Sequence, residues 1–154
     1  MSVNYLKIGE VAELLKITVR TIRYYEEEEL LEPHRTTGGT RLYTEQHLAR
    51  LKAILHLTEN GFPLDVIRLI GNTREACSTG NEGSEKISNI LDNSIKDVEE
   101  KINNLKHLKS ELSAAKKQVK KCNGCKNKPS RKGCPTCPVN KYLSKIEILN
   151  LVWE

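Results

Sequence analysis

The sequence has few aromatic residues and no long hydrophobic run. Aromatic residues make up 5% of its 154 residues and hydrophobic residues 38%, with one Trp, one Phe and one Met. Because large aromatic side chains are scarce, we expect an aliphatic core built by helices that each bury one apolar stripe. No stretch of roughly 18 apolar residues occurs, which excludes a membrane-spanning helix.

Two further absences narrow the class of protein. The N-terminal segment carries Glu10 and Glu13 where an export signal needs an unbroken apolar stretch. The sequence also lacks a Gly-rich phosphate loop, a Cys/His dyad in a recognisable context and a paired-carboxylate site. We therefore expect a soluble, cytoplasmic, mainly helical protein that is not an enzyme.

Acidic residues are missing from one segment of the chain. The net charge is +5, yet residues 116–154 hold ten Lys and Arg against two Asp and Glu. No carboxylate side chain occurs between Lys116 and Ile146. Such a segment can bind phosphate or stabilise a negatively charged centre, and a solvated basic tail is the plainer alternative.

Four of the five cysteines lie in this basic segment, spaced C-x2-C-x8-C-x2-C. In a reducing compartment, paired C-x2-C motifs are typical metal ligands rather than disulfides. Two such turns can bring four thiolates into a tetrahedron, and zinc or an iron–sulfur cluster would suit them equally. A thiol–disulfide switch without metal is the alternative. The predicted ligands are Cys122, Cys125, Cys134 and Cys137, while Cys77 stands alone upstream.

The N-terminal region has the pattern of a winged helix-turn-helix. Residues 8–15 carry apolar side chains at helical spacing, and Thr18 is a suitable N-cap for a second helix over residues 19–28. Gly38-Gly39 between short flanks favours a hairpin, or wing. Two more helices are predicted, over residues 44–59 and residues 63–70.

The second helix carries the side chains that a DNA-recognition helix needs. Cations and hydroxyls gather at its N-terminal end, where the helix dipole also favours phosphate. Ile22 and Tyr25 are expected in the core, and Glu26–Glu29 are expected to face solvent, away from DNA. The candidate DNA contacts are Thr18, Arg20, Thr21, Arg23 and Tyr24 on the helix, with Arg41 and Tyr43 on the wing.

A long helix is predicted over residues 85–121, after a hinge loop at residues 73–84. A lone helix of that length, about 55 Å, outreaches any core that this chain can build. Because the simplest partner is a second copy, we expect an antiparallel homodimer; a helix folded back on the N-terminal domain is the alternative. Apolar residues form a coiled-coil seam at Leu91, Ile95, Val98, Ile102, Leu105, Leu112 and Val119.

Four further motifs follow one another along the chain: Ile8-Gly9-Glu10-Val11-Ala12, Thr21-Ile22-Arg23-Tyr24-Tyr25-Glu26, Arg41-Leu42-Tyr43 and Asn60-Gly61-Phe62. Together, in this order, they resemble the mercury-resistance regulator (MerR) family. The resemblance implies a mainly α fold: a winged helix-turn-helix domain at 5–72, the hinge, an antiparallel dimerisation helix at 85–121, and a cysteine-rich tail with a terminal helix at 122–154.

The resemblance also implies a mechanism. Members of this family bind as dimers to an inverted repeat in double-stranded promoter DNA whose spacer is too long for RNA polymerase. The activated dimer bends and untwists that DNA, and phosphate contacts offset the cost of the deformation. By this analogy Arg20, Arg23, Tyr24, Arg41 and Tyr43 contact DNA.

What the tail senses is left open by the resemblance. Too few residues follow Lys121 for a drug-binding domain, so metal or redox sensing is expected. Mercury and zinc sensors of the family carry a cysteine at the place of Ser84, whereas Cys77 lies a full heptad earlier, in the hinge. This departure argues against a metal site shared between Cys77 and the tail. A redox-sensing member has similar loop ends, but its middle cysteine is absent here and Cys137 supplies the fourth thiol. A purely structural zinc with an unidentified effector is a further alternative.

Overall fold

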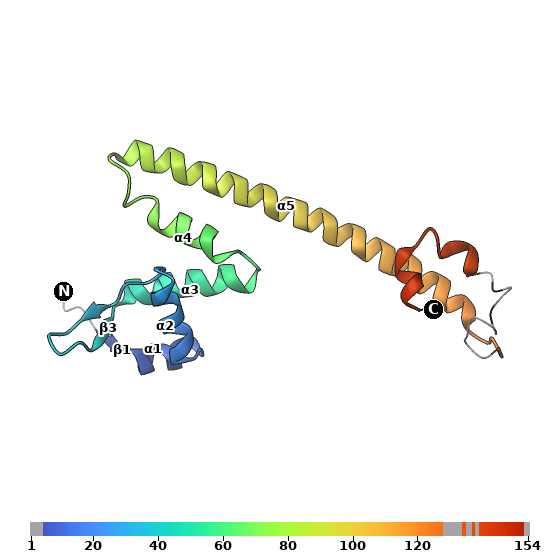
Figure 1. Ribbon diagram of the computed structural model, residues 1–154, viewed down its shortest axis with the longest axis horizontal. Helices are drawn as coiled ribbons and strands as arrows, with labels where there is room; N and C mark the ends of the chain where they lie inside the picture. The colour runs from blue at the N-terminus through green and yellow to red at the C-terminus, as the bar shows by residue number, and fades with distance from the viewer. Residues whose placement is uncertain (1–4, 128–133, 135–136, 138, 153–154) are drawn as a thin grey trace. The chain divides into compact units, whose positions relative to one another are not determined.

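The computed structural model describes residues 5–127, 134, 137 and 139–152. Within this part of the chain, five α-helices and three short strands follow one another from the N-terminus (Figure 1). The chain divides into two compact units, Met1–Asn93 and Ser94–Glu154. Over the described ranges, no helix combines the length and the hydropathy that crossing a membrane requires.

The first two helices form the predicted helix-turn-helix. Helix α1 (Ile8–Leu15) has the predicted bounds and ends at Lys16, whose φ of 55° turns the chain out of the helix. Helix α2 (Val19–Glu27) begins after Thr18, which is the predicted N-cap. The backbone N–H of Thr21 donates to Oγ1 of Thr18 at 3.0 Å, which satisfies one of the free donors of the first turn.

The wing is a small antiparallel sheet with strand order β1-β3-β2. Its strands are β1 (Leu6–Lys7), β2 (His34–Arg35) and β3 (Arg41–Tyr43). The hairpin between β2 and β3 turns at Gly39, whose φ of 80° suits glycine. The predicted Gly38-Gly39 hairpin is therefore confirmed.

Two further helices complete the winged region of the first unit. Helix α3 (Glu45–Glu59) begins after Thr44, whose Oγ1 accepts from the backbone N–H of His47. Helix α4 (Leu64–Asn72) begins after Pro63 and extends two residues beyond its predicted end. Gly61, with a φ of 73°, separates the two helices.

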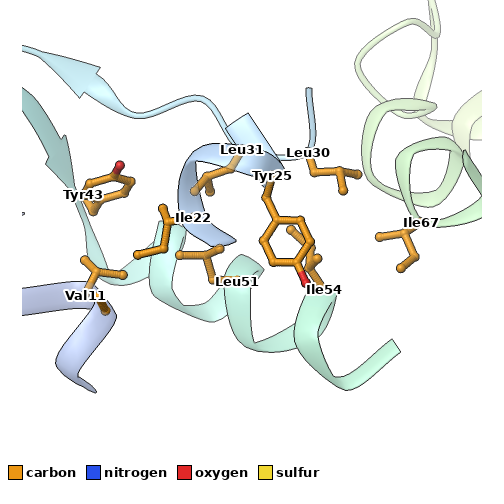
Figure 2. Close-up of a cluster of buried hydrophobic side chains, with 10 residues drawn as sticks. Val11, Ile22, Tyr25, Leu30, Leu31, Tyr43, Leu51, Ile54 and Ile67 are labelled. Carbon is orange, nitrogen blue, oxygen red and sulfur yellow. The ribbon is translucent and has the colours of Figure 1, made fainter. Parts of the chain in front are cut away.

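The core of the first unit gathers apolar side chains from α1 to α4 and the wing. Figure 2 shows them facing one another between these elements. Ile22 and Tyr25 are buried, as predicted, and this orients the opposite side of α2 outward. The fully or largely buried members are Val11, Ala12, Ile22, Tyr25, Leu30, Leu31, Tyr43, Leu51, Ile54 and Ile67.

The long helix α5 (Gly80–Val119) begins earlier than the sequence pattern predicted. The expected start was residue 85, because two nearby glycines read as a hinge. In the structure, the backbone N–H of Glu82 donates to Oγ1 of Thr79 at 3.2 Å, and the carboxylate of Glu82 accepts from the backbone N–H of Ser78 at 3.0 Å. These cap contacts start the helix at Gly80 despite its glycines.

The C-terminal segment packs against the end of α5 within the second unit. Val139 and Leu149 bury against Ala115 of the helix, and the red terminal segment lies beside the orange end of α5 (Figure 1). The expected terminal helix is instead two 3-10 segments, Asn140–Tyr142 and Glu147–Leu151, separated by the extended residue Ile146. Trp153, which that prediction included, lies outside the described residues.

Candidate functional site

Helix α2 presents its cations to solvent from the face opposite the core. Arg20 and Arg23 are exposed, and Tyr24 keeps 44% of its surface accessible. The hydroxyls of Thr18 and Thr21 lie 2.8 Å apart at the helix N-terminus, where the helix dipole favours an anion. Arg20, Arg23 and Tyr24 thus lie on the exposed side of α2, and Thr18 and Thr21 lie at its N-terminal end.

On the wing, the two predicted contacts have different surroundings. Arg41 is half-buried and keeps 31% of its side chain exposed. Tyr43 has no exposed surface, and its hydroxyl donates to the carboxylate of Glu26. The side chain of Tyr43 thus belongs to the core of the first unit, and its contact with DNA stays a prediction.

Glu26 was expected to be solvated, and the structure instead buries it between α2 and β3. Its side chain is 9% exposed, and Oε2 accepts from Nε of Arg41 at 2.6 Å. This hydrogen bond and the opposite charge raise the pKa of Arg41. Burial first, and then the bond to Glu26, raise the pKa of Tyr43 well above its ordinary value. Nothing within the run of four glutamates indicated this role.

The segment after α2 is held by side chains from α3 and α4. Arg50 donates from Nε to the carbonyl of Leu30 at 2.7 Å and from a terminal nitrogen to Oδ1 of Asn72 at 2.7 Å. Arg68 donates to the carbonyl of Glu28 at 2.8 Å and to its carboxylate at 2.6 Å. These bonds satisfy carbonyls just after α2 and hold this segment against α3 and α4.

The four predicted cysteine ligands come together in the second unit. Each C-x2-C pair closes the same kind of turn: Cys125 donates to the carbonyl of Cys122 at 3.0 Å, and Cys137 donates to that of Cys134 at 3.2 Å. Gly124, with a φ of 80°, lies within the first turn. All four cysteines line one cavity of about 170 Å³.

The thiols of this cavity influence one another. Burial raises the pKa of Cys122, and the neighbouring Cys137, Cys125 and Cys134 add to the shift. All of them are free cysteines. In the part of the chain that the structure describes, no three Cys, His, Asp or Glu side chains already stand in a metal-binding arrangement. The cavity thus gathers four soft ligands that still have to converge on a metal.

Cys77 has a separate environment in the first unit. It lies between α4 and α5, and its Sγ donates to the carbonyl of Thr73 at 3.1 Å. Its side chain is near Gly83 of the first turn of α5. Cys77 therefore packs locally within the first unit.

Comparisons with known families bear on both regions. Residues 6–72 match the family described as MerR HTH family regulatory protein, and residues 48–115 match that described as MerR, DNA binding. The two matches together span the winged domain and most of α5.

Two related proteins illustrate the similarity. The chain is 39% identical to the HTH-type transcriptional regulator ZntR homolog of Haemophilus influenzae, over 70% of this chain and 78% of that protein. It is 32% identical to the mercuric resistance operon regulatory protein of Bacillus cereus, over 90% of this chain and 97% of that protein.

Solved structures of MerR family regulators are also similar to this chain. A transcription regulator from Ralstonia metallidurans in complex with lead(II) superposes with a TM-score of 0.56 at 34% identity, covering 73% of this chain and 87% of that one. A MerR family regulator lacking the sensor domain, bound to promoter DNA, shares the fold with a TM-score of 0.64 at 24% identity, covering 79% and 95%. The chain therefore belongs to the MerR family of helix-turn-helix regulatory proteins, and it is a DNA-binding transcriptional regulator rather than an enzyme.

Proposed function

We propose that this regulator binds promoter DNA as an antiparallel homodimer and is switched by a thiolate-bound metal centre in its tail. The observation that carries the switch is the pair of matching C-x2-C turns lining one cavity. Four thiolates suit zinc, another thiophilic metal ion or an iron–sulfur cluster.

The residues around the cavity fit such a centre. Cys122, Cys125, Cys134 and Cys137 would hold it, each losing its thiol proton on binding. Four thiolates carry more negative charge than one divalent ion neutralises, and no carboxylate occurs between Lys116 and Ile146 to add to it. A closed zinc site would supply structural rigidity, whereas a cluster would supply one-electron redox chemistry.

Two relatives support a metal ion as the signal. The Bacillus cereus relative is named for mercuric resistance, and the Ralstonia metallidurans relative was solved with lead(II). The ligand set differs from the family pattern, since Ser84 replaces the expected cysteine and Cys77 belongs to the other unit. We therefore place the centre within the tail alone.

DNA binding is assigned to the exposed face of α2 and to the wing. Its cations and hydroxyls have the chemistry that holds phosphates, while the buried face of the same helix fixes their position. Tyr43 is left out because it is buried. The proposed contacts are Thr18, Arg20, Thr21, Arg23, Tyr24 and Arg41.

The proposed dimer rests on the apolar row of α5. These side chains keep between 39% and 64% of their surface exposed on a single chain. Exposing a regular apolar row to water is unfavourable in free energy, and a second copy of the helix would cover it. The exposed row comprises Leu91, Ile95, Ile102, Leu105, Leu108, Leu112 and Val119.

We further propose that the dimer bends and untwists the promoter DNA. The distorted promoter would then be used by RNA polymerase.

Metal analysis of anaerobically purified protein tests the switch. We expect about one metal ion or one cluster per chain, a cluster showing visible absorption with iron and sulfide. The Cys134→Ser variant should lose the bound centre and Cys77→Ser should keep it. Wild-type protein without metal or sulfide would contradict the proposal, and reversible oxidation of its thiols would then identify a thiol–disulfide switch.

A further inference from the structure

One buried carboxylate joins the recognition helix to the wing. Both oxygens of Glu26 are used: Oε2 accepts from Nε of Arg41 at 2.6 Å, and Oε1 accepts from the hydroxyl of Tyr43. Arg41 and Tyr43 are two residues apart in β3 and so lie on the same face of the strand. Glu26 therefore attaches α2 to this face through two contacts at once.

The bond to Glu26 uses only one edge of the Arg41 guanidinium. A guanidinium has five N–H donors in a planar fork, so Nε can be held while the terminal nitrogens stay available. The Arg41 side chain is 31% exposed, which leaves room for a second partner. A charge-assisted bond of this kind fixes the orientation of the plane.

A second arginine stands beside the first. Arg35 of β2 pairs directly with Arg41 in the register of the sheet, and Arg35 is exposed. Like charges opposite one another across a strand pair are unfavourable unless an anion compensates them. Glu26 compensates Arg41 from the protein side, and a phosphate is the anion that the solvent side of such a pair fits.

We infer that Glu26 is a positioning residue for DNA binding, which directs the free edge of Arg41, beside Arg35, at a backbone phosphate. The inference rests on the proposed contact of Arg41 with DNA. The inference predicts the direction in which DNA affinity changes when Glu26 loses its charge. Removing a carboxylate near DNA should strengthen binding by bulk electrostatics, whereas removing a positioning carboxylate should weaken it.

The test measures DNA affinity against salt for the full-length protein, on a duplex that the wild type selects from random sequence. The Glu26→Gln variant preserves the size of the side chain and removes its charge. We expect binding to weaken about tenfold, because one charge-assisted contact is lost. The slope of log affinity against log salt should become shallower by about 0.9 per protomer. Arg41→Gln should give the same slope, and the double variant should lose little more.

Two control variants separate positioning from charge and from folding. Glu27→Gln removes the same charge from the exposed neighbouring position and should leave binding unchanged or slightly tighter. Tyr43→Phe removes the other bond to Glu26 and should lower the thermal midpoint while keeping the salt slope. If Glu26→Gln does not fold, Arg41→Lys replaces it, since lysine keeps the charge without the fork and should bind more weakly.

The outcomes are distinguishable. Binding by Glu26→Gln that is as tight as that of Glu27→Gln, with a clear loss in Arg41→Gln, would overturn the positioning role and keep the contact. An unchanged salt slope in Arg41→Gln would overturn the proposed contact and the inference with it. If Glu26→Gln fails to fold, undiminished binding by Arg41→Lys would overturn the positioning role.

Discussion

The DNA-reading unit and the cysteine tail differ in how much hydrophobic core each contains. Among the described residues, the core of the first unit gathers ten buried side chains, and the cluster in the second gathers three. Stability from burial scales with apolar area, so a three-residue cluster needs a further constraint. The first unit therefore has a core of its own, and we expect the tail to depend for stability on a group bound by its thiols.

Removing the bound centre should give the largest effect, and only in the tail. Structural zinc sites contribute about 10–16 kcal/mol of apparent binding free energy to folding. After anaerobic treatment with EDTA, we expect amide hydrogen exchange to accelerate strongly around Val139 and Leu149. Exchange in α1 to α3 should stay unchanged. If the amide hydrogens of the tail exchanged equally slowly before and after removal of the centre, the tail would not depend on that centre for its stability.

A cavity in the core of the first unit should have the converse effect. Ile22 has no exposed surface, and Ile22→Ala should lower the free energy of unfolding by about 2–5 kcal/mol. Thermal unfolding followed by circular dichroism measures this loss, and metal content should be unchanged. Leu14→Ala is the matched control, because Leu14 is 61% exposed and its removal should cost less than about 0.5 kcal/mol.

The smallest expected effect is a pH dependence of the stability of the first unit. Burial first, and then the nearby charges of His34 and Arg50, lower the pKa of His47 in the folded protein. The folded state therefore favours neutral His47, whose Nδ1 accepts from the backbone N–H of Thr44 at 3.0 Å. This contribution to stability is complete above the ordinary histidine pKa of about 6.5 and is lost as pH falls through the lowered value.

Unfolding measured from pH 7 downward tests this. His47→Gln should flatten the pH dependence of the thermal midpoint. The same substitution at His56, an exposed position of α3, should preserve the wild-type profile. A profile that is unchanged in His47→Gln would remove His47 as the cause.

Local signals made most of the first unit predictable from sequence. Thr18 and Thr44 cap their helices as expected, because an N-cap depends on residues within one turn. The start of α5 was missed although Thr79 and Glu82 have capping-box spacing, since Gly80 and Gly83 suggested a hinge. The decisive signal there was also local.

The errors at the candidate site came from contacts that are distant in sequence. Glu26 lies in a run of four glutamates, and nothing local separates it from Glu27. Its burial depends on two β3 residues 15 and 17 positions further on. The burial of Tyr43 was missed for the same reason, because its hydroxyl finds a partner inside the fold. The cysteine spacing predicted a four-thiolate centre. All four cysteines line one cavity, and the centre itself stays a prediction.

Transcription in vitro tests the proposed switch directly. RNA polymerase transcribes from a promoter that the protein binds, in the presence of either the loaded full-length protein or the same protein stripped of its bound centre. We expect both forms to bind the promoter with similar affinity and their transcription to differ several-fold. The difference should vanish in Cys134→Ser and persist in Cys77→Ser. Equal transcription by the loaded and stripped forms would contradict the claim that the tail switches the DNA-reading unit.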